Sequence, residues 1–477
     1  MTDTEYDLVV LGAGPVGENV AAYAHSQGLT AVIVESELVG GECSYWACMP
    51  SKAMLRPIQA LRAARDLDGA KQAVTGTIDT GAVLRRRDHF VNDFDDSGQV
   101  EWMESEGLDL VRGRGRLAGV KQVVVDQPDG TEVRLTARRA VAVCTGSAAS
   151  VPPIEGLREA QPWTSREATG AQAVPESLVV IGGGVVACEE ATTYAGLGTR
   201  VTLLARSGLL GGTEPFAGEL VGDGMRDLGV DVRLGTSPER VERTGDGVVV
   251  TLADGSTVQA AEVLVATGRS PRTADLGLAS VGLEDGEWLD VDDTMLVSGA
   301  TNDGDPWLYA VGDVNHRALL THQGKYQARA AGRVIAARAK GEPLDDAPWG
   351  RHVATADARS VPQTTFTDPE VAYVGLTEQA ARDEGLAVRT VEYDLHKVAG
   401  AKLYTDHYTG RAKFVVDDDR DVLLGATFVG PDVAELLQAA TIAVVGEVPL
   451  QRLWHAVPAY PTVSEIWLRF LEKDGHA

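Results

Sequence analysis

Short hydrophobic runs recur along the chain, and they predict buried parallel strands. Residues 7–11 (DLVVL), 31–34 (AVIV) and 177–181 (SLVVI) are the clearest of these runs. Strands that are apolar on both faces are typical of parallel sheets covered by helices. Residues 18–28, between the first two runs, are predicted to form a helix. The N-terminal part therefore predicts a strand–helix–strand unit.

The turn after the first strand has the spacing Gly-x-Gly-x-x-Gly, with glycines at positions 12, 14 and 17. Gly12 permits the tight turn, Gly14 lets a pyrophosphate approach the helix N-terminus, and Gly17 allows close helix packing. Glu35 follows the second strand, where a carboxylate can accept hydrogen bonds from a ribose. This order of elements is the Rossmann fingerprint, and it predicts a dinucleotide site.

A second copy of this pattern starts 170 residues later. The run 177–181 leads into Gly182, Gly183 and Gly184, and Ala187 takes the place of the third glycine. Each copy closes on a hydrophobic run that ends in Thr-Gly, at Gly146 in the first and Gly268 in the second. The repeat therefore predicts two nucleotide-binding units.

Two cysteines, Cys43 and Cys48, lie in the segment GGECSYWACMPSK (residues 40–52). A bare Cys-x4-Cys can be a structural disulfide, half a metal site or chance. Its place at the end of a dinucleotide-binding unit favours a redox pair. The other two cysteines, Cys144 and Cys188, are expected to be buried small apolar residues.

The composition suits a large acidic globular protein. The chain has 477 residues, 44% of them hydrophobic, so about three domains are expected. The net charge of −26 disfavours nucleic acid and anionic membrane surfaces as partners. No apolar run is long enough to span a bilayer, and the acidic start lacks the features of a signal peptide, so we expect a cytoplasmic protein. In a reducing compartment a disulfide is more often catalytic than structural.

The segment 40–52, the two glycine turns and the run Leu308–Asp313 together resemble the class I pyridine nucleotide-disulfide oxidoreductases, the family of glutathione reductase, lipoamide dehydrogenase and mercuric reductase. Ala47 stands where this family usually has glycine. The resemblance implies an α/β fold with two Rossmann-like nucleotide-binding domains and a C-terminal α+β dimerisation domain. The implied boundaries are 1–150 with 270–345 for the FAD domain, 151–269 for the NAD(P)H domain and 346–477 for the interface domain.

The same resemblance implies roles for individual residues. FAD is expected in the first unit, where Asp313 would bind the ribityl chain, and a nicotinamide nucleotide is expected in the second. Lys52 would lie near the flavin and pair with Glu189. Cys43 and Cys48 would form the redox disulfide, with Cys48 touching the flavin and Cys43 attacking the acceptor.

The second unit lacks the acid that favours an unphosphorylated ribose. Glu35 lies 23 residues after Gly12, and the position 23 residues after Gly182 is Ala205. Arg206 follows it, and an arginine beside this position suits a 2′-phosphate. NADPH is therefore predicted over NADH, which stays possible.

The C-terminal region departs from the family. Glutathione and lipoamide enzymes have His-Pro-Thr-x-x-Glu, whereas this chain has Tyr460 in place of the histidine and keeps Glu465. Imidazole, with a pKa near ~6.5, exchanges protons at neutral pH, whereas a phenol near ~10 mainly donates. In the implied homodimer, Tyr460 of one subunit, supported by Glu465, would donate to the group leaving Cys43 of the other. His455 is the alternative proton carrier.

The sequence thus predicts an enzyme that passes electrons from NADPH through FAD to Cys43–Cys48 and on to a small disulfide-type acceptor. One alternative is a flavin-level reductase of quinones, metal ions or other small acceptors, and another is a redox-sensing or scaffold subunit. No resident metal is predicted. Mercury is disfavoured as the substrate, because residues 472–477 contain no cysteine pair. The run Arg85–Arg87 is expected to lie on a solvated helix.

Overall fold

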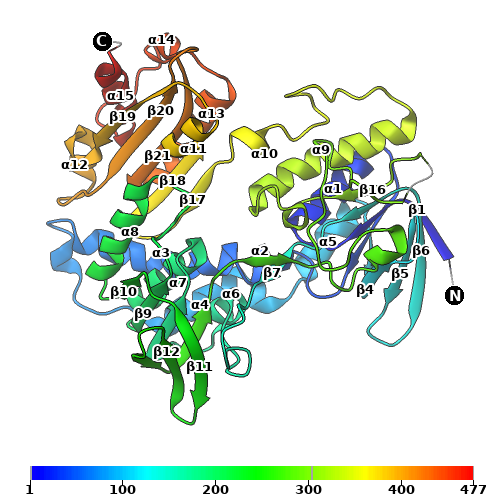
Figure 1. Ribbon diagram of the computed structural model, residues 1–477, viewed down its shortest axis with the longest axis horizontal. Coiled ribbons are helices and arrows are strands. Elements are labelled where there is room, and N and C mark those ends of the chain that lie inside the picture. Colours follow the sequence, from blue (N-terminus) through cyan, green and yellow to red (C-terminus); the bar gives the residue numbers. More distant parts are fainter. Residues whose placement is uncertain (1–2, 302–303, 476–477) are drawn as a thin grey trace. The chain divides into compact units, whose positions relative to one another are not determined.

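The computed structural model describes residues 3–301 and 304–475, and the chain divides into two compact units (Figure 1). The first unit comprises Met1–Pro50, Asp88–Ala148 and Arg269–Ala358. The second unit comprises Ser51–Arg87, Ala149–Gly268 and Arg359–Ala477. Each unit is therefore assembled from three separate stretches of sequence.

A seven-stranded sheet forms the centre of the first unit. Its order is β3-β2-β1-β6-β5-β4, and β16 also pairs with β6. The parallel strands are β1 (Asp3–Leu11), β2 (Ala31–Glu35), β3 (Asp109–Arg112), β6 (Glu132–Val143) and β16 (Leu308–Ala310). The antiparallel strands are β4 (Arg114–Leu117) and β5 (Gln122–Asp126). The helices of this unit include α1 (Pro15–Ser26), α2 (Gly41–Tyr45), α5 (Ser97–Ser105), α9 (Thr321–Lys340) and α10 (Ala356–Arg359).

The first helix begins earlier than the sequence predicts. Helix α1 starts at Pro15 and not at residue 18, with Gly14 in the N-cap position. Proline suits the first helical position because an N–H at that position would have no acceptor within the helix. The helix ends at Ser26, two residues before Gly28, which has a φ of +91°. The predicted strand–helix–strand unit is confirmed.

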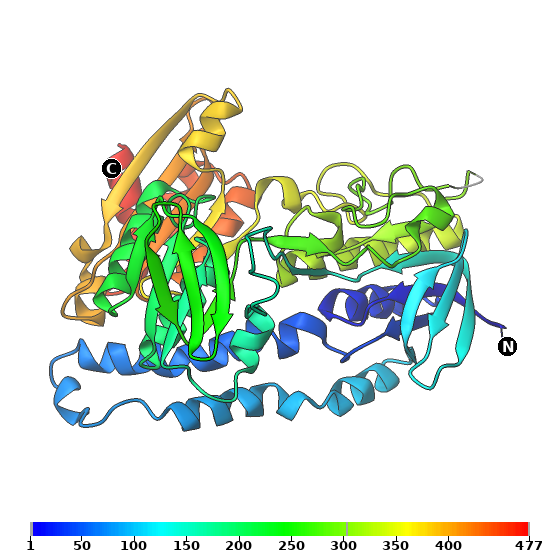
Figure 2. The same cartoon turned by 60° about the horizontal axis from the view of Figure 1, so that its bottom comes forward.

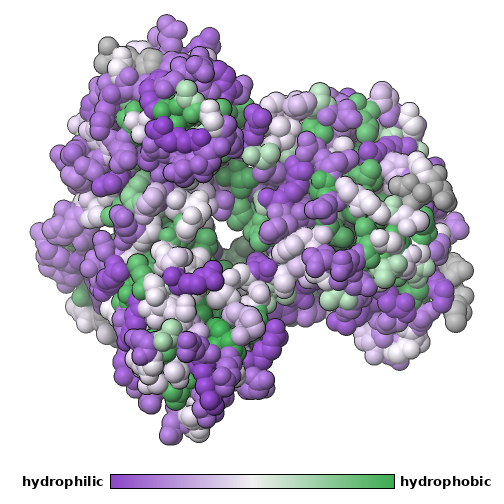
Figure 3. All heavy atoms as spheres, in the orientation of Figure 1, coloured by the Kyte–Doolittle hydropathy of each residue, from purple (hydrophilic) through white to green (hydrophobic). Residues whose placement is uncertain are grey.

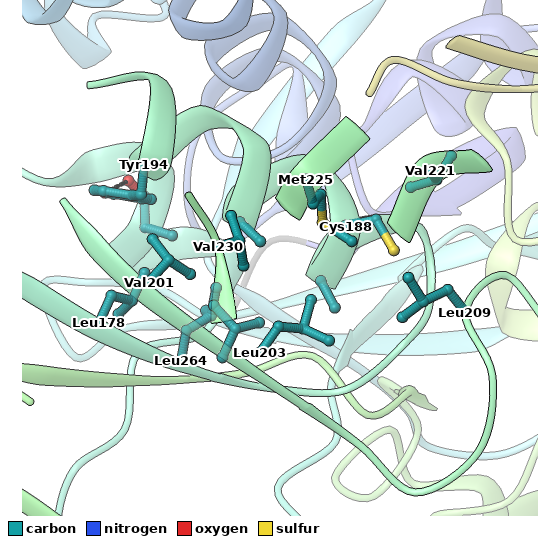
Figure 4. Close-up of a cluster of buried hydrophobic side chains, with 14 of the residues drawn as sticks. Leu178, Cys188, Tyr194, Val201, Leu203, Leu209, Val221, Met225, Val230 and Leu264 are labelled. Atoms are coloured by element: carbon teal, nitrogen blue, oxygen red, sulfur yellow. Dashed lines mark hydrogen bonds between the residues drawn. The ribbon is translucent and has the colours of Figure 1, made fainter. Parts of the chain in front are cut away.

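The second Rossmann-like unit is a four-stranded parallel sheet of order β10-β9-β8-β14. Its strands are β8 (Ser177–Ile181), β9 (Arg200–Ala205), β10 (Asp231–Leu234) and β14 (Glu262–Val265). In Figure 4, Cys188 and Met225, from helices α7 (Val185–Gly196) and α8 (Pro215–Asp227), lie against Leu203 of the sheet. Figure 2 shows a separate three-stranded sheet in green, made of β11 (Pro238–Thr244), β12 (Gly247–Leu252) and β13 (Thr257–Ala260).

The C-terminal region is a five-stranded antiparallel sheet with helices, as the predicted α+β class requires. The order is β17-β18-β21-β20-β19. The strands are β17 (Gln363–Thr365), β18 (Glu370–Gly375), β19 (Val388–Asp394), β20 (Arg411–Asp417) and β21 (Val422–Gly430). The helices are α11 (Glu378–Asp383), α12 (Ala399–Tyr404), α13 (Leu437–Val445), α14 (Leu450–Leu453) and α15 (Ile466–Asp474). Phe414 of β20 stacks on Phe470 of α15, with ring centroids 4.1 Å apart.

One expectation about the surface is wrong. Two helices, α3 (Cys48–Arg65) and α4 (Thr80–Phe90), follow α2 along the chain. Helix α4 carries the run Arg85–Arg87, which was expected to lie in solvent. Arg85 is exposed, but Arg87 is fully buried and donates hydrogen bonds to the backbone carbonyls of Thr169 and Ala171. A guanidinium can be buried when such acceptors meet its donors.

Hydrophilic side chains cover most of the face shown in Figure 3, in keeping with the high charge. Throughout the described residues, no helix is both long and apolar enough to cross a membrane.

Candidate active site

The first glycine turn is built so that larger residues do not fit. Gly12 has a φ of +103°, and a Cβ there would lie 2.5 Å from the carbonyl oxygen of Cys144. A Cβ on Gly17 would lie 1.9 Å from the carbonyl oxygen of Gly12. At Gly14, by contrast, nothing lies within 4 Å of an added Cβ. The turn is therefore closed toward the sheet and open at the helix N-terminus, which suits an approaching pyrophosphate.

Glu35 lies at the end of β2 and faces this turn. Its Oε2 accepts the N–H of Ala13 and its Oε1 accepts the N–H of Glu37, both at 2.7 Å. These bonds orient the carboxylate. The hydroxyl oxygen of Thr145, which follows β6, is buried without a hydrogen-bond partner. An orphaned polar atom beside the turn is what a site for a polar ligand would leave.

Asp313 follows strand β16 and is held in a polar cluster. It accepts a hydrogen bond from the hydroxyl of Ser147, and Nε of Arg269 donates to the same hydroxyl oxygen at 2.6 Å. Arg269 Nε lies 3.8 Å from the Asp313 carboxylate. Gly146, with a φ of +70°, ends the run before Ser147. Sequence reasoning singled out Gly146 and Asp313 but missed Ser147 and Arg269.

The two candidate redox cysteines lie on consecutive helices. Cys43 is in α2 and Cys48 is the first residue of α3, and both are partly buried. Sγ of Cys48 lies 3.5 Å from Oγ1 of Thr321, the first residue of α9. Beside Cys43, Glu42 forms an ion pair with Arg272 at 2.8 Å. Neither contact could be predicted from the sequence, because each partner is more than 200 residues away.

The other cysteines have the opposite environment. Cys144 and Cys188 are buried, and burial raises the pKa of both thiols, that of Cys188 to about 12. A thiol that stays protonated is a poor nucleophile. The expectation that these two cysteines are packing residues is confirmed for their burial.

Lys52 of α3 and Glu189 of α7 form an ion pair. Nζ of Lys52 lies 2.6 Å from Oε2 of Glu189. The second oxygen, Oε1, accepts the N–H of Phe366 at 2.8 Å, and Lys52 Nζ lies 5.1 Å from the Phe366 ring centroid. Sequence reasoning predicted the pair and missed Phe366. Both oxygens of this buried carboxylate therefore have donors.

The second glycine turn repeats the geometry of the first. Gly182 has a φ of +141°, and a Cβ there would lie 2.2 Å from the carbonyl oxygen of Ala266. Gly184 is the N-cap residue of α7 and has open space around it. Ala187, in the third glycine position, is fully buried. Gly268 closes the unit with a φ of +144°. This turn can also accept a pyrophosphate.

The loop after β9 carries no carboxylate that could bind a ribose. Ala205 is buried at the end of the strand, and Arg206 is exposed. The first acid that follows is Glu214, and its carboxylate is already used: it binds Nζ of the buried Lys413 at 2.8 Å and the N–H of Glu378 at 2.7 Å.

Tyr460 and Glu465 have contrasting surroundings. Tyr460 is 77% exposed, whereas Glu465 is 4% exposed. Oε2 of Glu465 is buried without a partner, and its Oε1 lies 3.8 Å from Arg469. Within residues 304–475, no hydrogen bond joins Tyr460 to Glu465. His455 is also exposed.

The sequence profile described as pyridine nucleotide-disulphide oxidoreductase matches residues 6–337, and the profile of the dimerisation domain of the same family matches residues 361–469. The chain belongs to the pyridine nucleotide-disulphide oxidoreductases. The predicted family and fold class are confirmed.

Several members of the family resemble the chain over almost its full length. It is 31% identical to a mercuric reductase of Staphylococcus aureus over 97% of this chain and 81% of the relative. It is also 31% identical to a dihydrolipoyl dehydrogenase of Halobacterium salinarum, over 99% and 97%. The crystal structure of LpdA from Mycobacterium tuberculosis superposes with a TM-score of 0.82 at 25% identity, over 98% and 99% of the two chains.

As a pyridine nucleotide-disulphide oxidoreductase, the protein is a flavoprotein enzyme that depends on FAD and uses a pyridine nucleotide. The described glycine turns, with Glu35 and Asp313, fit these ligands. The dimerisation domain supports a homodimer.

Proposed function

We propose that this enzyme takes electrons from NADPH and delivers them through the Cys43–Cys48 pair to a small disulfide-type acceptor. The observation that carries the proposal is the helix α3, which begins at Cys48 and holds Lys52 in its ion pair with Glu189 one turn later. Bound FAD would supply the two-electron chemistry that links nicotinamide to disulfide. The remaining chemistry belongs to residues of this chain.

Different residues of this chain would bind different parts of FAD. Gly12, Gly14 and Gly17 leave the helix N-terminus open to the pyrophosphate, and Glu35 accepts the ribose hydroxyls. Gly146 and Asp313, with the donors around them, hold the ribityl chain. Lys52 and Glu189 compensate each other's charge beside the flavin, so neither is left as an unpaired buried charge when the charge of the site changes.

In the proposed redox step, the Cys43–Cys48 bond accepts two electrons and one proton, the equivalent of a hydride, and opens to one thiol and one thiolate. Cys43 then attacks the acceptor, and the leaving group takes a proton. Tyr460 of the partner subunit is the proposed donor. Its high exposure in the single chain leaves it available to a second subunit. Glu465 would act on Tyr460 from within its own chain.

NADPH is proposed over NADH because of the residues at the second turn. Gly182, Gly184 and Gly268 would hold the nucleotide, while Arg206 would bind the 2′-phosphate. The absence of a free carboxylate in residues 205–213 removes the usual repulsion of that phosphate. We also propose the domain boundaries and the cytoplasmic location predicted from the sequence.

The first experiment is anaerobic reduction of the purified holoenzyme, with NADPH and NADH in separate samples, while the flavin spectrum is recorded. A long-wavelength thiolate-to-flavin band is expected in the wild type and not in Cys48→Ser, and it should form faster with NADPH. Cys43→Ser should lose turnover of disulfides. Full turnover of the acceptor by Cys43→Ser would disprove the relay.

One observation favours a second candidate function, direct reduction of quinones or metal ions at the level of the flavin. Tyr460 stands where disulfide-reducing members have a histidine, which weakens proton exchange with thiols. In this case the flavin would bleach without the long-wavelength band, and Cys43→Ser would keep its activity toward quinones.

A further inference from the structure

Next to the Lys52–Glu189 pair lies a second buried acid, Glu190, which neither the family resemblance nor the proposed relay uses. All residues of α7 from Ala187 to Tyr194 are buried, and Glu190 is 2% exposed. Its Oε2 is buried without any hydrogen-bond partner. The hydroxyl oxygen of Thr193, one turn further along, is in the same condition.

Two neighbouring acids on one helix therefore have opposite surroundings. Glu189 receives an ammonium on one oxygen and a backbone N–H on the other. Glu190 has no donor for Oε2, and a buried carboxylate without donors is costly, so the neutral acid is favoured. Burial, helped by the charge of Glu189 and opposed by that of Lys52, raises the pKa of Glu190 to about 8. Such a pair divides into a charged and a proton-holding member.

The charged groups around Glu190 are few. Glu189 and Tyr194 lie on its own helix, and Lys52 faces it from α3. Tyr194 donates to the carbonyl of Ala168, and its raised pKa keeps it neutral. The positive charge of Arg87 in α4 lowers the pKa of Tyr194, but burial has the larger and opposite effect. Among these groups Lys52 has solvent access, with 35% of its side chain exposed.

We propose that Glu190 takes up a proton from solvent when the redox site beside Lys52 gains negative charge. This inference rests on the proposed function, which puts the Lys52–Glu189 pair beside the flavin. Hydride brings two electrons and one proton, and opening the disulfide with them leaves one thiol and one thiolate. The thiolate adds one negative charge. An ionised Glu190 then accepts one proton, and the total charge of the site is unchanged.

The sign of the effect follows from Coulomb repulsion. An added negative charge raises the pKa of a neighbouring carboxyl group. Below about pH 7 Glu190 is already protonated, so reduction changes nothing at this residue. Above about pH 8 an increasing share is ionised before reduction and protonated after it. Reduction should therefore take up as much as one extra proton in the alkaline range.

The test is a potentiometric titration of the flavin in the holoenzyme between pH 6 and pH 10. Between pH 8 and pH 10, the two-electron reduction equilibrium of the wild type should change by up to tenfold more per pH unit than that of Glu190→Gln. The two should run parallel below pH 7. Glu219→Gln, which removes an exposed acid of α8, should follow the wild type. Glu190→Met offers a second neutral variant should the amide disturb folding.

Coincident slopes for the wild type and both Glu190 variants would overturn the inference. A second readout does not involve the flavin: the unfolding midpoint of the wild type should fall relative to Glu190→Gln as the pH rises from about 5 to above 8, and an unchanged difference would also count against it. Failure of the relay is seen separately, as loss of the long-wavelength band. A steeper wild-type slope without that band would support proton uptake by Glu190 and contradict the disulfide relay alone.

Discussion

The Nζ atom of Lys52 lies 2.6 Å from Oε2 of Glu189, and this pair joins α3, the helix that starts at Cys48, to α7, the helix that starts at the second glycine turn. Glu189 is 7% exposed at its side chain and Lys52 is 35% exposed. Loss of the ion pair would therefore be more costly for the buried Glu189 carboxylate than for the partly exposed Lys52 ammonium. The pair couples the two helices by charge as well as by packing.

Removing the lysine should therefore cost more than removing both charges. Lys52→Met leaves a buried carboxylate with only the Phe366 N–H, and we expect a loss of ~1–3 kcal/mol in the free energy of unfolding, below the cost of breaking a fully buried pair because Lys52 is partly exposed. The double variant Lys52→Met/Glu189→Leu should recover part of this loss. Urea unfolding of the four proteins in the cycle gives the coupling energy, and simple additivity would refute it.

The burial of Glu18 should make the free energy of unfolding depend on pH. It lies in the first turns of α1, is 8% exposed, and its Oε1 has no partner. Burial raises its pKa from 4.5 to about 7, although the charge of Lys325 lowers it and that of Glu35 raises it.

Because the folded-state pKa is raised, the contribution of Glu18 is fully present below pH 4.5 and is lost as the pH rises through about 7. The wild type should lose about 3 kcal/mol at most relative to Glu18→Gln over this range. Unfolding of both proteins at pH 5 and pH 8 measures the difference. If the stability difference between Glu18→Gln and the wild type is the same at pH 8 as at pH 5, the assignment is contradicted.

Features with a local cause could be predicted from the sequence. The turns at Gly12 and Gly182 need φ values and close approaches that glycine alone supplies, so spacing was sufficient to find both. Lys52 and Glu189 were predicted from the family pattern, and the structure brings them together.

Features that depend on distant contacts could not be predicted. The acceptors of Arg87 lie more than 80 residues away, and the N–H bound by Glu189 lies 177 residues away. Nothing near Glu190 in sequence distinguishes a buried acid from a surface one. In the proposed homodimer, the surroundings of Tyr460 would come from a second subunit, and the contacts within one chain do not contain them.

Replacing the buried Arg87 should destabilise the fold far more than replacing the exposed Arg85 of the same helix. Arg87→Met keeps much of the side-chain volume but leaves the carbonyls of Thr169 and Ala171 without this donor. Unsatisfied buried acceptors cost about 1–3 kcal/mol each, so we expect a loss of ~2–4 kcal/mol. Arg85→Met, on the exposed side of the same helix, should stay within ~0.5 kcal/mol of the wild type. Thermal unfolding of the two variants distinguishes them, and equal midpoints would show that Arg87 does not act through these bonds.

Arg206 should determine the choice of nicotinamide nucleotide. Arg206→Ala removes the proposed partner of the 2′-phosphate, so the ratio of kcat/KM for NADPH to that for NADH should fall by roughly 10- to 100-fold, through a higher KM for NADPH. The values for NADH should change little. Arg200→Ala is the matched control, because Arg200 is an exposed arginine at the start of β9, the strand that Arg206 follows, and its partner is Glu176. A ratio that changes equally in both variants would mean that only general surface charge is sensed.

Tyr460 should limit the exchange of protons with thiols, and a histidine in its place should relieve the limit. Tyr460→His introduces an imidazole with a pKa near ~6.5, so turnover of a disulfide at pH 7 should rise by about 10-fold or more. Tyr460→Phe removes the donor and should lower it. In the proposed mechanism Glu465, whose Oε2 has no partner in the single chain, would orient this imidazole, so adding Glu465→Gln to Tyr460→His should cancel much of the gain. Steady-state rates from pH 6 to pH 9 provide the measurement. If Tyr460→His leaves disulfide turnover unchanged while quinone reduction persists in Tyr460→Phe, electrons leave from the flavin and the second candidate function takes the place of the first.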